Sequence, residues 1–149
     1  MTEADIEDIS GDIWLGWNAT TLFIAARMEY ATHSNPALIG ADLWQGSAWQ
    51  LQVGGVLNPS HMNDGRNELG FALGTNPPRQ LAHAWFTAGP TGDQGFNATM
   101  SPGENFVVRR DGNITYYEIA IPFSTQTTTI DALEEGMLIP FSQDRKSVV

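Results

Sequence analysis

Apolar and polar residues alternate with a period of two along most of this chain, as they do in β-strands with one buried face. The clearest example is the stretch 43–53. Its apolar side is formed by Trp49, Leu51 and Val53, and its polar side by Ala48, Gln50 and Gln52. We expect this central strand to pack its apolar side into a core and to present the two amide side chains on its other side.

The same alternation recurs before and after the central strand, and it predicts about eight short strands. They are expected at 12–17, 22–28, 48–53, 69–73, 81–86, 106–110, 114–121 and 137–143. Asn18-Ala19-Thr20 and Asp111-Gly112-Asn113 mark the turns of two antiparallel hairpins, because such residues favour tight reversals of the chain. Loops are expected at 30–42, 58–67 and 88–104, with a short strand at 96–100 and one helical turn at 130–135.

Many short strands with little helical periodicity predict an all-β fold, an antiparallel β-sandwich of the jelly-roll or immunoglobulin-like type. A chain of 149 residues is long enough to bury a substantial core, and it contains no internal repeat. We therefore expect a single domain over residues 1–149.

Charge and composition exclude several classes of partner. The chain has seven basic and seventeen acidic residues, a formal net charge of -10, which disfavours nucleic acid and anionic membranes. No apolar run approaches the roughly 18 residues of a membrane span. Without cysteine, the chain has no disulfide, thiolate metal site or cysteine nucleophile. Neutral ligands remain compatible with this composition.

The first residues, Met1-Thr2-Glu3-Ala4-Asp5-Ile6-Glu7-Asp8, are acidic and do not form an export signal. The localisation stays open. The protein is expected in the cytoplasm if this chain is complete, or outside the cell if it is part of a longer exported protein.

The most suggestive chemistry lies around Trp44. This indole precedes Gly46 on a predicted loop, next to the strand that bears Gln50 and Gln52. A flat ring beside amides suits a sugar, whose CH faces stack on indole while its hydroxyls form hydrogen bonds. The alternative is structural: the polar face meets water, and Trp44 covers the edge of the core.

Three segments carry a recognisable order of motifs: residues 8–25, 43–51 and 110–123. This order is similar to that of family 9 carbohydrate-binding modules, members of a wider DOMON-like group that binds sugars or haem. Asp8-Ile9-Ser10-Gly11, Trp14-Leu15-Gly16-Trp17-Asn18 and Leu22-Phe23-Ile24-Ala25 resemble the family's opening "D-L-S-A … W-D … L-Y-V-A". The stretch 43–51 resembles its "W-x-x-D-S-x-x-I" segment. The stretch 110–123 is similar to its "G-x-Y-E-x-A-I-P-W" strand.

The resemblance implies a sugar clamped between two tryptophans, with Trp44 as the first of them and Gln50 as a polar contact. Ser47 replaces the family's usual aspartate, and no tryptophan follows Trp85, where the second ring of the clamp normally comes. A strand that commonly precedes the first motif is also missing. We expect the remaining ring and polar contacts among these candidates: Gln52, Trp14, Trp85 and Tyr116.

The sequence gives less support for a cofactor than for a sugar ligand. The three histidines have no metal-ligand spacing, and His83 is expected to be a hydrogen-bonded core or interface residue. A haem would need an axial pair, for which the sequence offers only Met62 with His83. Calcium is the other candidate cofactor, through oxygen donors in one glycine-bearing turn: Asn63, Asp64, Asn67 and Glu68.

No nucleophile elbow, phosphate loop or nucleotide fingerprint occurs, so we do not expect an enzyme. Glu68 and Glu118 could form a carboxylate pair in principle, but Glu118 is expected to pair with Arg109 and Arg110 across a hairpin instead.

Two interpretations remain. The first is a non-catalytic sugar-binding module, free-standing or an accessory domain of a glycoside-active enzyme. The second is a structural or assembly protein without a small-molecule ligand, which forms homo-oligomers through exposed sheet edges.

Overall fold

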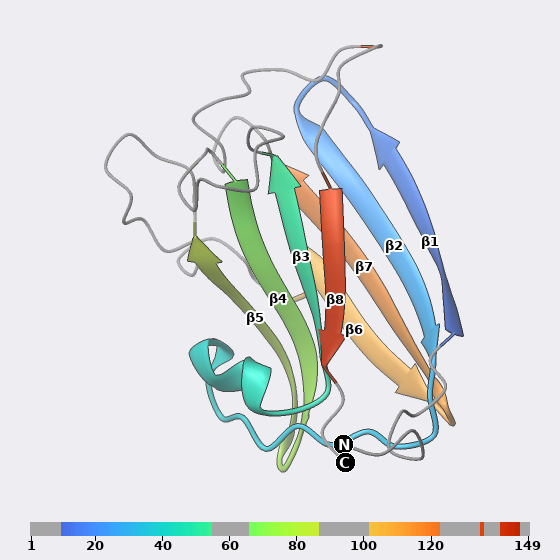
Figure 1. Ribbon diagram of the computed structural model, residues 1–149, viewed down its shortest axis with the longest axis vertical. Helices are drawn as coiled ribbons and strands as arrows, with labels where there is room; N and C mark the ends of the chain where they lie inside the picture. Colours follow the sequence, from blue (N-terminus) through green and yellow to red (C-terminus); the bar gives the residue numbers. More distant parts are fainter. Residues whose placement is uncertain (1–9, 55–65, 87–101, 123–134, 136–140, 147–149) are drawn as a thin grey trace.

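The computed structural model describes residues 10–54, 66–86, 102–122, 135 and 141–146 (Figure 1). Within them, eight strands and one 3₁₀-helix follow one another. In chain order they are β1 (Ser10–Trp17), β2 (Thr21–Glu29), η2 (Gly40–Gln45), β3 (Ala48–Gly54), β4 (Arg66–Thr75), β5 (Pro78–Phe86), β6 (Phe106–Asp111), β7 (Ile114–Pro122) and β8 (Phe141–Lys146).

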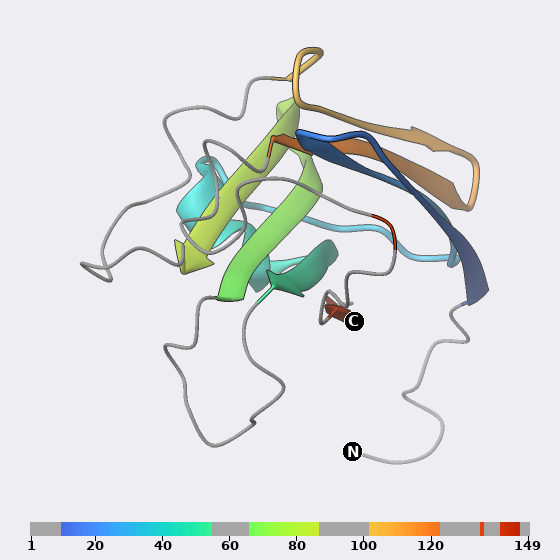
Figure 2. The ribbon, with the colours of Figure 1, turned by 90° about the horizontal axis from the view of Figure 1, so that it is seen from above.

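These strands form two antiparallel sheets of four strands each, which lie as two layers in Figure 2. Sheet A has the order β1-β2-β7-β6, and sheet B has the order β5-β4-β3-β8. The expectation of a mostly β, antiparallel fold is confirmed. Both predicted hairpins are present, β1 with β2 and β6 with β7, and each lies in sheet A.

The main core lies between the two sheets and is built by one side of each alternating strand. The predicted apolar side of β3 is buried, and its Trp49 ring lies 5.1 Å from the Tyr117 ring of β7 in the other sheet. The indole Nε1 of Trp49 also donates a hydrogen bond of 2.9 Å to Gln143 on β8. The alternation in β7 is confirmed too, with its buried side formed by Thr115, Tyr117, Ile119 and Ile121.

A second, smaller core covers the outer side of sheet B. Leu43 of η2 is fully buried there among Ala37, Ala48, Ala72 and Leu81, with Trp85 packed against them. Strand β5 therefore has two apolar sides. Ala82 and Ala84 face the main core, while Leu81 and Trp85 face this second cluster.

Several predicted boundaries were wrong. The 3₁₀-helix η2 begins at Gly40, inside the expected loop 30–42, and β5 begins at Pro78 rather than at residue 81. The expected loop 58–67 ends earlier, because β4 already begins at Arg66. The last strand extends to Lys146 rather than ending at Gln143. The predicted strand at 96–100 lies outside the described residues, as do residues 130–134 of the predicted helical turn.

Candidate functional site

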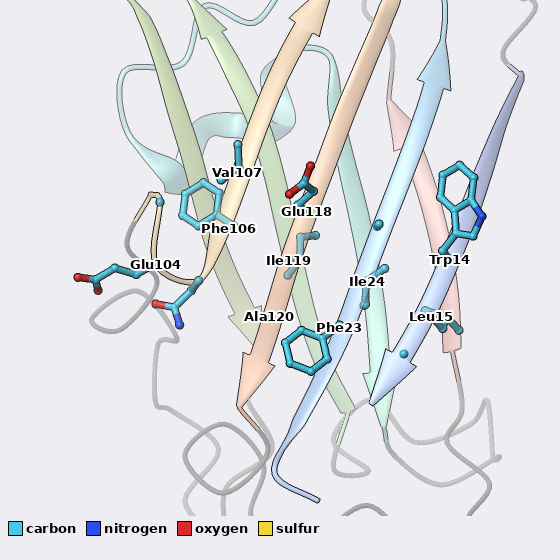
Figure 3. Close-up of a pocket in the computed structure, with 14 residues that line it drawn as sticks. Trp14, Leu15, Phe23, Ile24, Glu104, Phe106, Val107, Glu118, Ile119 and Ala120 are labelled. Carbon is cyan, nitrogen blue, oxygen red and sulfur yellow. The ribbon is translucent and has the colours of Figure 1, made fainter. Parts of the chain in front are cut away.

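The outer side of sheet A contains a hollow of about 650 Å³, a size typical of small-molecule sites (Figure 3). It is lined by residues of all four strands and of the turn before β6. The inward side chains of these strands form the core, so their outward side chains and the sheet backbone form the surface of the hollow.

The strand register arranges the outward residues in rows that run across the sheet. One row, read from β1 to β6, is Trp14, Ala25, Glu118 and Val107. The next row is Gly16, Phe23, Ala120 and Asn105, where the backbone N–H of Ala120 donates to the Asn105 carbonyl. Small residues thus alternate with large ones, and they leave a low floor between the projecting side chains.

Two aromatic rings project from this floor. The exposed fraction is 55% for Trp14 and 44% for Phe23. The two rings come from neighbouring strands and are diagonal neighbours across the pair, because Trp14 is opposite Ala25 and Phe23 is opposite Gly16. They offer flat apolar surfaces to a ligand in the hollow.

Glu118 lies near the middle of the same surface, two strands from Trp14 and roughly 10 Å away at ordinary strand spacing. Its side chain is exposed and projects from β7 (Figure 3). The residues directly opposite it are apolar, Ala25 on one side and Val107 on the other.

The expected ion pair of Glu118 with Arg109 and Arg110 is wrong. Arg109 is opposite Tyr116 and places its guanidinium 4.3 Å from the centre of that ring. Arg110 donates a hydrogen bond of 2.8 Å to the backbone carbonyl of Tyr30. Among the residues that the structure describes, Glu118 forms neither a salt bridge nor a side-chain hydrogen bond.

A second acidic residue, Glu104, lies at one end of the hollow, on the tight turn before β6, and its side chain points away from the other lining residues (Figure 3). In that turn the backbone N–H of Gly103 donates to the carbonyl of Phe106 over 2.8 Å. Gly103 has a φ of +83°, a conformation that glycine adopts without strain. The local sequence thus fixes the chain reversal that brings Glu104 to the hollow.

The candidate sugar contacts from the sequence do not form one group, because they lie on opposite outer sides of the two sheets. Trp14 and Tyr116 project from sheet A, in adjacent rows. The other four lie on the outer side of sheet B: Trp44 in η2, Gln50 and Gln52 on β3, and Trp85 on β5. Trp44 is 48% exposed, but it lies in the 3₁₀-helix η2 and not on the predicted loop. Trp85 instead packs against Leu43 and the sheet.

Two of the three histidines, His33 and His83, lie in the described part of the chain. His33 forms hydrogen bonds to the Tyr30 hydroxyl at 3.0 Å and to the Leu73 carbonyl at 2.7 Å. His83 contacts the edge of Trp85, but its buried Nδ1 has no hydrogen-bond partner among the described residues. The expectation that His83 is hydrogen-bonded is therefore wrong for Nδ1. Met62, its proposed axial partner for haem, lies outside the described residues.

The next candidates are a metal site and a pair of carboxylates. The described residues contain no group of three or more acidic or histidine side chains suited to a metal ion. The calcium candidates Asn63 and Asp64 lie outside those residues, and Asn67 and Glu68 are on β4. Glu68 is on the outer side of sheet B and Glu118 on that of sheet A, so they do not form a pair.

Comparison with known proteins gives no relative: no protein-family model, no curated protein and no solved structure matches this chain. No helix within the described ranges is long and apolar enough to cross a membrane.

Sequence reasoning missed the hollow because its rows depend on the pairing of β2 with β7, which are far apart along the chain. One local signal was present. The outward positions Gly16, Ala25 and Ala120 are small in three strands, whereas an ordinary solvated face would have longer polar side chains.

Proposed function

We propose that this chain is a non-catalytic carbohydrate-binding domain of the β-sandwich type, and that its ligand occupies the hollow on the outer side of sheet A. The observation that supports this most is the row from Trp14 to Glu118. It joins an exposed indole to a hydrogen-bond acceptor across a floor of small residues. A pyranose ring has the matching features, an apolar CH face and a rim of hydroxyls.

The order of motifs that resembles family 9 modules supports the same function. The first motif forms β1 and β2, and the third forms β7, which are three of the four strands around the hollow. The second motif forms η2 and β3 on the other sheet. The resemblance alone would place the sugar at Trp44, so the two tryptophans define two alternative sites.

A titration with neutral oligosaccharides, followed by NMR or tryptophan fluorescence, tests the function. Stacking on one ring is worth about 1 kcal/mol, and each sugar hydroxyl gains little over water, so we expect affinities of about millimolar. Ligand concentrations must therefore reach tens of millimolar. Absence of any saturable response over a panel of glycans would contradict the proposal.

Two matched variants locate the site. Trp14→Ala is expected to weaken binding about fivefold, the equivalent of one stacking contact of about 1 kcal/mol. Because Trp14 is more than half exposed, the melting temperature should change little. Trp44→Ala removes a similarly exposed indole on the other sheet and should leave the affinity as it was. The reverse result would keep the function and move the site to Trp44.

A second function, assembly through β1, is favoured by a separate observation. β1 is an edge strand of sheet A, and it pairs with β2 without a bulge along its whole length. Leu15 and Trp17 on its inward side remain 52% and 59% exposed. A regular, apolar edge strand is a template for pairing with another chain, here a second copy in antiparallel orientation. The oligomeric state in solution tests this alternative.

A further inference from the structure

The hollow on sheet A is lined by acidic but not by basic residues of the described part of the chain. Its two charged lining residues in the described part of the chain are both carboxylates, Glu104 and Glu118. The chain as a whole has a net charge of -10, so the surrounding field adds to this local sign. Such a field attracts cations and repels acidic sugars such as uronates.

Within the described residues, Glu118 also forms no salt bridge. The nearest arginines on the outward face are Arg27 and Arg109, in the next row of sheet A. Arg27 forms a salt bridge of 3.1 Å with Glu29, and Arg109 stacks on Tyr116. Because both arginines have other partners, the Glu118 carboxylate is left to accept hydrogen bonds from a ligand, and an ammonium group suits it.

The aromatic rings favour the same kind of group. A cation over an indole or phenyl face is attracted by the negative potential of the ring, and Trp14 and Phe23 both expose their rings beside the hollow. A neutral hydroxyl can donate a hydrogen bond to the carboxylate, but it has no positive charge to interact with the carboxylate or with the ring potential. An amino group on the ligand gains from both.

We infer that the ligand is a saccharide with free amino groups, of the glucosamine type, whose ammonium contacts Glu118 while a sugar ring stacks on Trp14. This inference rests on the proposed function and specifies its substrate class. A simple amine would leave most of the hollow of about 650 Å³ empty, whereas a short oligosaccharide fills it and spans the row between the two residues.

The test compares three trimers with one backbone and linkage: glucosamine, its N-acetylated form, and glucose. Titrations are made at mildly acidic pH, where the amino groups are protonated, and at low and high salt. We expect the glucosamine trimer to bind at least about tenfold more tightly than the other two, with a preference that decreases as salt screens the charges. Equal affinities for the three trimers would overturn the inference and leave the proposed function intact. Failure of all three trimers to bind would also overturn the inference, and the proposed function would then depend on the wider glycan panel.

Variants separate a specific contact from general attraction to an acidic protein. Glu118→Gln keeps the shape of the side chain and is expected to reduce the ratio of glucosamine to glucose affinity to near one. Glu68→Gln makes the same charge change on the outer side of sheet B and should preserve the ratio. An equal fall of the ratio in both variants would show non-specific attraction and overturn the inference. A lysine tripeptide, which has ammonium groups without sugar rings, should bind more weakly than the glucosamine trimer, and equal binding would also overturn the inference.

Discussion

The hydroxyl of Thr115 donates a hydrogen bond of 2.6 Å to the hydroxyl of Tyr30, and both residues are buried. This contact is the centre of a chain of hydrogen bonds. Arg110 donates to the Thr115 hydroxyl at 2.9 Å, and the Tyr30 hydroxyl contacts Nδ1 of His33 at 3.0 Å. Since the Leu73 carbonyl can only accept, Nε2 of His33 carries a hydrogen. The chain thus connects sheet A with β4 of sheet B.

Thr115→Val tests the energetic role of this chain. Valine has the same shape but no hydroxyl, so Tyr30 and Arg110 each lose a hydrogen-bond partner in a buried environment. We expect the free energy of unfolding to fall by about 1–3 kcal/mol, measured by urea denaturation. Thr115→Ser, which keeps the hydroxyl and loses one methyl group, should cost about 1 kcal/mol. If valine is tolerated better than serine, packing rather than hydrogen bonding is the role of this position.

Asn35 organises the segment that contains Trp44. Its fully buried amide Nδ2 donates to the carbonyls of Leu43 at 2.9 Å and Ser47 at 3.1 Å, and its Oδ1 accepts from the backbone N–H of Ala37 at 3.0 Å. Asn35→Ala leaves these buried backbone groups without their partner. We expect a loss of about 2–4 kcal/mol of stability and faster amide hydrogen exchange in η2.

Ser34→Ala is the matched control for Asn35→Ala. Ser34 is exposed next to Asn35, and its contacts to Ser47 use its backbone, which alanine retains. Its stability should therefore remain within about 0.5 kcal/mol of the parent protein. Equal effects of the two substitutions would contradict the role given to the Asn35 amide.

Gly70→Ala tests how tightly Trp85 packs on sheet B. A Cβ at Gly70 would lie 2.5 Å from Cη2 of Trp85 and 2.8 Å from Cδ1 of Leu43. Both side chains would have to move, so we expect a loss of about 1–3 kcal/mol and a changed near-UV circular dichroism spectrum.

Gly16→Ala is the same substitution in a strand, but at a position where a side chain has space. No atom lies within 4 Å of a Cβ at this position, on the outer side of sheet A. Alanine loses less backbone freedom on folding than glycine, so stability should rise by about 0.5–1 kcal/mol in thermal or urea unfolding. A loss as large as that of Gly70→Ala would mean that backbone conformation, not side-chain space, decides both results.

The sequence predicted the local part of this fold well, and the reason is physical. Alternation with a period of two depends only on neighbouring residues, and so the buried side of β3 and the hairpin of β6 with β7 could be read directly. The turn residues of Asp111-Gly112-Asn113 determined the second hairpin, with Gly112 at a φ of +55°.

The candidate site was harder to predict from the sequence, because it depends on which strands become neighbours. Trp14 was named as a candidate, but its partnership with Glu118 requires β2 to pair with both β1 and β7. The ion pair of Glu118 was also predicted wrongly, because it was inferred from the distance to the arginines along the chain. The register puts Arg109 opposite Tyr116 rather than opposite the Glu118 carboxylate. Non-local pairing leaves no periodic signal along the chain.

The edge strand β1 gives the last prediction. If β1 of two copies pair, the protein should form dimers at micromolar concentration, observable by sedimentation velocity. Each chain has a net charge of -10, and so higher salt should screen the repulsion between copies and increase the dimer fraction. Leu15→Lys places a charge on the inward side of the edge and should give a monomer.

Leu38→Lys is the matched control for Leu15→Lys, because Leu38 is similarly exposed, at 58% against 52%, but lies outside the strands. It should dimerise like the parent protein, since a lysine there does not meet the pairing edge. A strictly monomeric parent at both low and high salt would exclude assembly through β1. A dimer disrupted by Leu38→Lys but not by Leu15→Lys would instead place the interface near η2, because the segment with Leu38 leads into that helix.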